Sequence, residues 1–83
     1  MTTELLHQGA RLYARWLALQ LALNHYEQIE IGLKEGNLPA RLGVHVMETH
    51  NMYRSSIPEN LIEETTYFKD ALNEIVARGE KVF

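Results

Sequence analysis

The chain has 83 residues, of which 46% are hydrophobic and 23% charged, and its formal net charge is −3. This length predicts a single domain over residues 1–83, and this balance is typical of a folded globular protein. The sequence has no cysteine, which excludes disulfide scaffolds, thiol nucleophiles and cysteine metal sites. A small domain without such cross-links depends on its apolar core, and association with a second chain is a common way to enlarge that core.

The first predicted element is one long helix over residues 3–34. Its apolar residues recur at steps of three and four, as in a coiled-coil seam: Leu5, Leu12, Trp16, Leu19, Leu23, Tyr26 and Leu33. A second apolar stripe runs beside the seam and contains Leu6, Ala10, Tyr13, Leu17 and Leu21. Residues 28–33 alternate with period two, so we expect any irregularity in this helix near Gly32.

Two shorter helices are predicted after it, over residues 38–54 and 57–78. Gly36 has the position of a helix C-terminus and Asn37 that of the next N-cap. Ser56 and Glu59 have the spacing of a capping box for the last helix. The fold class is therefore all-α: a three-helix chain whose bundle is completed by oligomerisation.

The run 38–45 resembles the turn region of helix-turn-helix repressors, in which a Leu-Ala-x-x-Leu-Gly-Val string leads into the recognition helix. The resemblance covers about 20 residues, and implies a DNA-binding regulator that uses residues 38–54. The sequence departs from the pattern at Pro39, and Arg54 is the one cationic residue of the recognition segment. Because phosphate contacts supply most DNA affinity, we predict no specific duplex binding at micromolar concentration.

Four histidines suggest a second alternative, a metal-binding helical protein. His45 and Glu48 share a helix face, but His50 points about 140° away from His45. His25 lies near Glu27 and Glu30 without the spacing of a di-iron bundle. We therefore expect no high-affinity metal site within one chain and no cofactor.

Glu30 falls in the apolar seam, where a carboxylate needs a partner if it is buried. Lys34, four residues later, is the nearest cation, and a residue of a second chain is the other candidate. We expect instead that the helix turns slightly and leaves Glu30 exposed to solvent.

No phosphate-binding glycine loop, nucleophile elbow or catalytic triad is found, so we do not expect an enzyme. The residues 16–23 after Arg11 and Arg15 imitate a secretion signal, but Gln20 interrupts them and no cleavage site follows. No segment has the roughly 20 apolar residues of a membrane span. We expect a cytoplasmic protein that makes no contact with membranes.

These observations predict a small accessory, regulatory or inhibitor protein that acts by protein–protein interaction. It is expected to form a homodimer or a larger assembly through its first helix. The residues predicted to carry self-association are Leu12, Trp16, Leu19, Leu23 and Tyr26. The residues predicted to contact a basic protein partner are Glu63, Glu64, Asp70 and Glu74.

Overall fold

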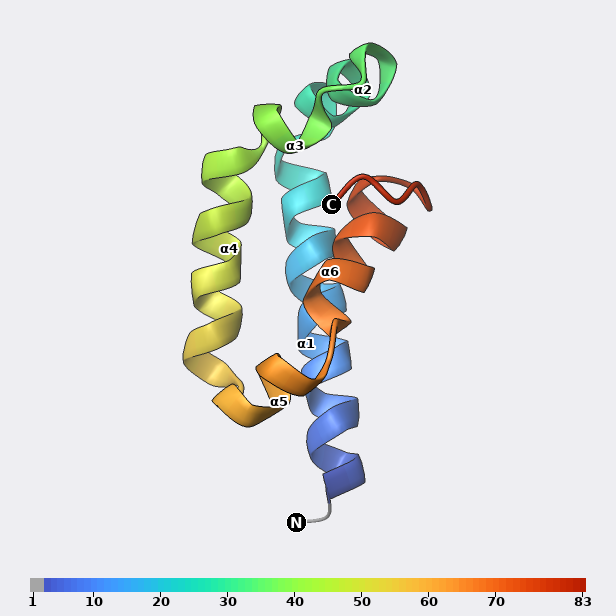
Figure 1. Cartoon of the computed structure of the whole chain (residues 1–83). Helices are drawn as coiled ribbons and strands as arrows, with labels where there is room; N and C mark the ends of the chain where they lie inside the picture. The colour runs from blue at the N-terminus through green and yellow to red at the C-terminus, as the bar shows by residue number, and fades with distance from the viewer. Residues whose placement is uncertain (1–2) are drawn as a thin grey trace.

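A computed structural model describes residues 3–83, and every regular element within that range is helical. The elements are α1 (Thr3–Asn24), α2 (Tyr26–Glu35), α3 (Leu38–Arg41), α4 (Gly43–Ser56), α5 (Glu59–Glu64), α6 (Tyr67–Ala71) and the π-helix η1 (Leu72–Val76). Figure 1 shows α4 and α6 lying along opposite flanks of α1, with α2 and α3 across one end. The molecule is elongated, with extents of 43 × 21 × 20 Å.

The core lies where α1 meets α4, α6 and η1. Small residues on α1 allow α6 and η1 to approach closely, and Ala14 and Ala18 are fully buried. Tyr53 of α4 fills the other side of α1, and its burial raises the pKa of its hydroxyl. The all-α class predicted from the sequence is confirmed, but the three predicted helices are divided into six α-helices and a π-helix among the described residues.

The predicted single helix over 3–34 is wrong, because the chain bends at His25. The backbone there leaves the helical region, at φ −129° and ψ 33°. The His25 N–H still donates to the Leu21 carbonyl at 3.1 Å, and the His25 carbonyl accepts from the Ile29 N–H at 3.0 Å. The joint is therefore a bend between α1 and α2. Asn24 and His25 have weak helix propensity, and the bend buries Ile29 in the core.

Gly36 ends α2, as the sequence predicted. It adopts the left-handed conformation (φ 74°), and the following Asn37 N–H donates to the Gly32 carbonyl at 3.0 Å. Gly32 itself allows a close approach of α3, since a Cβ there would lie 2.8 Å from the Leu38 Cα. The Asn37 side chain does not cap α3 and instead accepts a hydrogen bond from Arg41.

The predicted helix over 57–78 is interrupted at Thr65 and Thr66, where Thr65 is extended. Both hydroxyls donate locally, Thr65 to the Leu61 carbonyl at 2.8 Å and Thr66 to an Asp70 carboxylate oxygen at 2.9 Å. Such bonds compete with the helical pattern. The predicted capping box is wrong as well, because Ser56 is the last residue of α4.

The C-terminal residues fold back onto η1. The Asn73 side-chain oxygen accepts from the backbone N–H groups of Val82, at 3.1 Å, and Phe83, at 2.8 Å. Phe83 packs against the core. None of the helices between residues 3 and 83 has both the length and the apolar character that a membrane span requires.

Candidate interaction surface

The helix α1 is apolar on two opposite faces. With 3.6 residues per turn, the stripe that contains Ala10, Leu17 and Leu21 points into the molecule, and these three side chains are buried. The predicted seam points the other way. Leu12, Trp16, Leu19 and Leu23 are each 46 to 68% exposed. We call these four residues the α1 seam. The structure thus brings four of the five predicted self-association residues together in one exposed row.

Trp16 is held in place by a column of aromatic rings. Its indole stacks on Tyr13, with centroids 6.1 Å apart, and Tyr13 stacks in turn on the buried Tyr53 at 6.3 Å. The column extends from the core of the protein to the centre of the α1 seam. The seam therefore carries a supported aromatic side chain at its middle.

Tyr26, the fifth predicted residue, lies beyond the bend on α2. It is 60% exposed, but the Arg78 guanidinium lies over its ring at 5.4 Å. Tyr26 is therefore separated from the straight row of the α1 seam and packs with the C-terminal segment.

Arg78 also forms an ion pair with Glu30. Glu30 is exposed, as expected, and its cation is Arg78 rather than the nearer candidate Lys34. Hydrogen bonding and proximity to Arg78 hold the pKa of the Glu30 carboxyl below its ordinary value. No sequence pattern links Glu30 to Arg78, which lies 48 positions later. The backbone of Arg78 is left-handed, with φ 55°.

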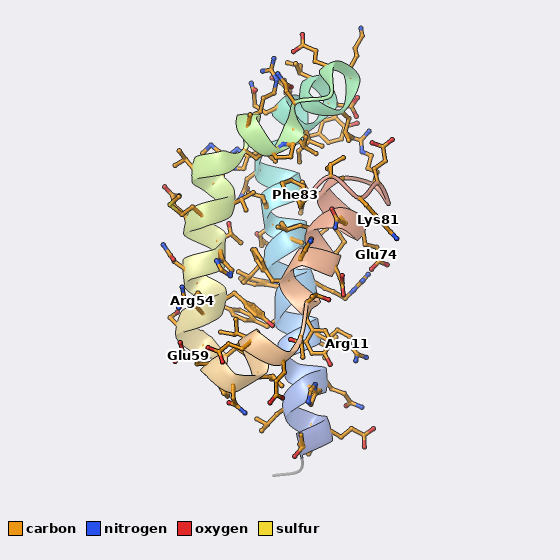
Figure 2. The ribbon with its side chains drawn as sticks, viewed as in Figure 1. Arg11, Arg54, Glu59, Glu74, Lys81 and Phe83 are labelled. Atoms are coloured by element: carbon orange, nitrogen blue, oxygen red, sulfur yellow. The ribbon has the colours of Figure 1, made fainter. Side chains whose placement is uncertain are left out.

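On the α6 side, the flank of the α1 seam is polar and paired. Arg15 donates to a Glu74 carboxylate oxygen at 2.7 Å. Arg11 lies over the Tyr67 ring at 4.9 Å, and His7 forms a hydrogen bond of 2.7 Å with the Tyr67 hydroxyl. Figure 2 shows Arg11 and Glu74 projecting on the side where α6 lies.

The four predicted partner-binding carboxylates do not form one face. Glu74 is paired with Arg15, and Asp70 accepts the Thr66 hydroxyl. Glu63 and Glu64 lie on α5 and are exposed. Of the predicted set, these two are the ones whose carboxylates have no partner within the described chain.

On the α4 side, the flank of the α1 seam is a groove of about 320 Å³. Trp16, Gln20 and Asn24 line its α1 wall, and His45, Glu48, Thr49 and Met52 line its α4 wall. We call it the α1–α4 groove. It joins the α1 seam directly, because Trp16 belongs to both.

His25 and His45 close one end of the α1–α4 groove. Their rings stack with centroids 3.9 Å apart. Burial, and secondly the neighbouring His45, lower the pKa of His25, while Glu48 opposes this shift. His50 lies apart from them, with its ring against Phe68 at 5.1 Å. Residues 3–83 contain no group of three or more side chains placed to hold a metal ion.

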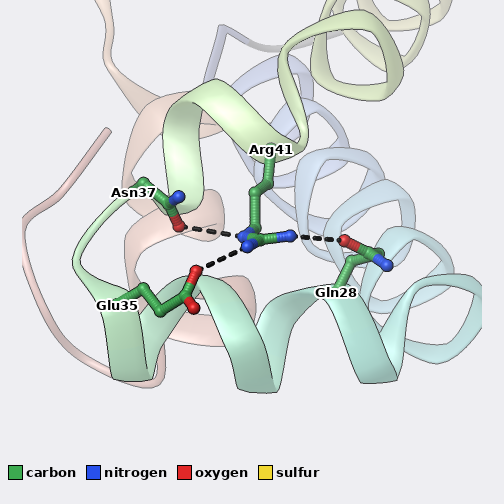
Figure 3. Close-up of polar contacts among 4 residues, drawn as sticks. All are labelled: Gln28, Glu35, Asn37 and Arg41. Carbon is green, nitrogen blue, oxygen red and sulfur yellow. Dashed lines mark hydrogen bonds and ion pairs between the residues drawn. The ribbon is translucent and has the colours of Figure 1, made fainter.

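A cluster of polar side chains around Arg41 joins α2 to α3. Arg41 donates to Asn37 at 3.0 Å, to Gln28 at 3.1 Å and to Glu35 at 2.5 Å (Figure 3). All of its partners come from one helical hairpin. Arg41 therefore stabilises the turn after α2. Sequence reasoning missed this cluster because Gln28 and Glu35 lie 13 and 6 positions from Arg41, outside helical spacing.

The geometry of residues 38–54 differs from a helix-turn-helix motif. Such motifs join two helices by a turn of three or four residues. Here α3 has four residues, and Leu42 alone connects it to α4. Gly43 is the first residue of α4 and does not have a positive φ. This geometry does not favour the DNA-binding alternative.

Comparisons with protein-family models, with curated proteins and with solved structures found no match to this chain.

Proposed function

We propose that this chain is a non-enzymatic helical protein that acts through protein–protein contacts and forms a homodimer through the α1 seam. The observation that carries the proposal is the exposed row of Leu12, Trp16, Leu19 and Leu23, opposite the core face of the same helix. Soluble monomers rarely expose a contiguous apolar patch of this kind without a binding role.

A second copy of the chain is the occupant that this row fits best. Its steps of four, three and four residues are those of a coiled-coil seam, which is complementary to itself. The helix α1 extends over 22 residues, or about three heptads. Pairing two such helices buries both seams in one contact, which is favourable at about 25 cal/mol per Å² before association costs.

Light scattering with intrinsic fluorescence tests the proposal. The wild-type chain should have about twice the monomer mass of 9.6 kDa at tens of micromolar. Trp16 is the single tryptophan, so its emission should shift to shorter wavelength as concentration rises. The double variant Leu19→Lys, Leu23→Lys should give a monomer with unchanged helicity by circular dichroism.

Met47→Lys is the matched control, because Met47 is equally exposed but lies on α4. It should leave the mass of the dimer unchanged. A wild-type chain that stays at the monomer mass with full helicity contradicts the proposal.

We also propose that the chain binds a basic protein partner through Glu63 and Glu64 of α5. Their carboxylates are exposed and lack a cation in the described chain, which supports an electrostatic role. A cytoplasmic location also belongs to it, because small secreted domains are commonly stabilised by disulfides and this chain has no cysteine.

A further inference from the structure

We infer that the α1–α4 groove binds an arginine side chain of the basic protein partner, with the guanidinium held between the indole of Trp16 and the carboxylate of Glu48. This inference deepens the proposed contact with a basic protein and rests on it. It adds a binding site on α1 and α4 to the contact proposed for α5, and it does not depend on self-association.

The charge of the groove favours a cationic ligand. Glu48 is exposed in the α4 wall, and its carboxylate forms no hydrogen bond or ion pair within residues 3–83. None of the eight lysine and arginine residues, all of which lie in the described range, lines the groove. Arg15 is paired with Glu74 on the other flank of α1, and Arg41 is engaged in the cluster that joins α2 to α3. A phosphate would therefore find no cation in the groove, whereas a cationic group would find an unpaired carboxylate.

The α1 wall supplies acceptors for the other N–H groups of a guanidinium. Trp16, Gln20 and Asn24 follow one another at intervals of four residues, which places them on one side of α1. In the part of the chain that the structure describes, neither amide side chain forms a hydrogen bond. A guanidinium carries five N–H donors and no acceptor, so the side-chain oxygens of Gln20, Asn24 and Glu48 are complementary to it. A lysine ammonium has three donors and lacks the planar face that stacks on an aromatic ring.

Trp16 offers the face of its indole to the cation. Tyr13 stacks on one face of the ring at 6.1 Å, and the tryptophan side chain is still 52% exposed. Indole is the best aromatic partner of a cation, and arginine is the cation found most often against it, because its planar group also stacks. The column of rings from Tyr53 through Tyr13 orients the indole before the ligand arrives, which lowers the entropy cost of binding.

The stacked histidines make the affinity of this site depend on pH. The titratable groups of the groove are His25 at the bend and His45 and Glu48 of α4, whereas α1 contributes neutral amides. On the adjoining elements, Glu27 of α2 is exposed, and Arg41 of α3 bonds to its own cluster. Glu48 lies close enough to His25 to oppose the lowering of its pKa. Protonation of His25 places a positive charge beside Glu48, and the affinity of the groove for a cation then falls.

Fluorescence titration tests the site, because Trp16 is the single tryptophan and lines the groove. The probes are the peptide acetyl-Gly-Arg-Gly-amide and its analogue with citrulline, which has nearly the same shape and no charge. The chain is used at submicromolar concentration, where mass action dissociates the proposed dimer. At pH 7.5 the arginine peptide should change the emission and saturate, with a dissociation constant about tenfold or more below that of the citrulline peptide.

Paired glutamine substitutions test the part played by Glu48. Glu48→Gln should weaken binding of the arginine peptide about threefold or more, because the amide keeps the shape of the carboxylate and removes its charge. Glu63→Gln is the matched control, since Glu63 is an exposed carboxylate of α5 outside the groove, and it should leave the dissociation constant within about twofold. Lowering the pH from 7.5 to 5.5 should weaken wild-type binding about threefold, and His25→Gln should reduce this dependence.

The outcomes separate the groove site from the proposed function. Binding that is lost in Glu48→Gln and kept in Glu63→Gln supports the groove site. Equal affinities for the arginine and citrulline peptides overturn it. A loss in Glu63→Gln but not in Glu48→Gln also overturns it and leaves the basic partner at α5 standing. An affinity that is the same at pH 7.5 and 5.5 overturns the coupling to His25.

Discussion

The two faces of α1 carry similar numbers of apolar side chains but differ in size. The inward face has alanine at positions 10, 14 and 18, together with Leu17 and Leu21. The outward face has three leucines and the single tryptophan. Small side chains allow neighbouring helices to approach α1, whereas bulky ones hold other elements away. Close packing within the chain therefore selects the alanine face, and the bulkier face stays exposed.

The two faces of α1 should differ most in the free energy of unfolding that is lost when a leucine is shortened to alanine. Leu17→Ala should lower the free energy of unfolding by about 2–5 kcal/mol, because it leaves a cavity beside α1. Leu19→Ala should change the free energy of unfolding of the dilute monomer by less than about 0.5 kcal/mol. Urea denaturation at submicromolar concentration measures both.

At higher concentration, Leu19→Ala should lose stability relative to wild type, since stabilisation by association depends on concentration. An equal loss for both variants at high dilution would show that Leu19 is covered within the monomer, and the contrast between the faces would then fail.

The sequence predicted which positions of α1 form its two apolar stripes, but it did not predict which of the two stripes is buried. Both stripes follow helical spacing, and only the packing of α6 and η1 on Ala14 and Ala18 distinguishes them. The end of α2 at Gly36 was predictable, because a left-handed residue at a helix terminus is commonly glycine. The spacing likewise identified positions 12, 16, 19 and 23 as members of one stripe.

The bends of the chain depended on contacts between distant residues. Sequence spacing favoured a break near Gly32, but Gly32 stays helical and accommodates Leu38, and the bend falls at His25. The pair of Arg78 with Glu30 joins the C-terminal segment to α2 and leaves no local pattern. The α1–α4 groove also depends on tertiary packing, since it joins residues more than 20 positions apart.

Substitutions at two glycines should change the free energy of unfolding by intermediate amounts. Gly32→Ala should destabilise the fold by about 1–3 kcal/mol, since its Cβ would meet backbone and side-chain atoms of Leu38. Gly9→Ala should stabilise it by about 0.5–1 kcal/mol, because Gly9 is helical and a Cβ there meets nothing within 4 Å. Thermal denaturation of the two variants side by side measures both, and a stabilising Gly32→Ala would contradict the close approach of α3.

The smallest expected effect is the pH dependence at the end of the α1–α4 groove. The pKa of His25 is below its ordinary value of 6.5, because burial and the neighbouring His45 disfavour the imidazolium. The unfolded chain therefore binds more protons than the folded chain between the two pKa values, and stability rises with pH there. The free energy of unfolding should decrease as the pH falls from 7.5 through 6.5 towards the lowered pKa of His25, and then level off.

Urea titrations between pH 5 and 7.5, with a chelator present, measure this slope. The window lies above the pH range in which Glu30 gains its proton, because the pKa of Glu30 is lowered from 4.5. His25→Gln should reduce the slope, because it removes the group whose protonation differs between the two states. His50→Gln should preserve it, since His50 packs on Phe68 away from the stacked pair. An unchanged slope in His25→Gln would mean that the contact between His25 and His45 does not couple folding to protonation. The contribution of this end of the α1–α4 groove to the free energy of unfolding would then not depend on pH, as expected also for the apolar α1 seam beside it.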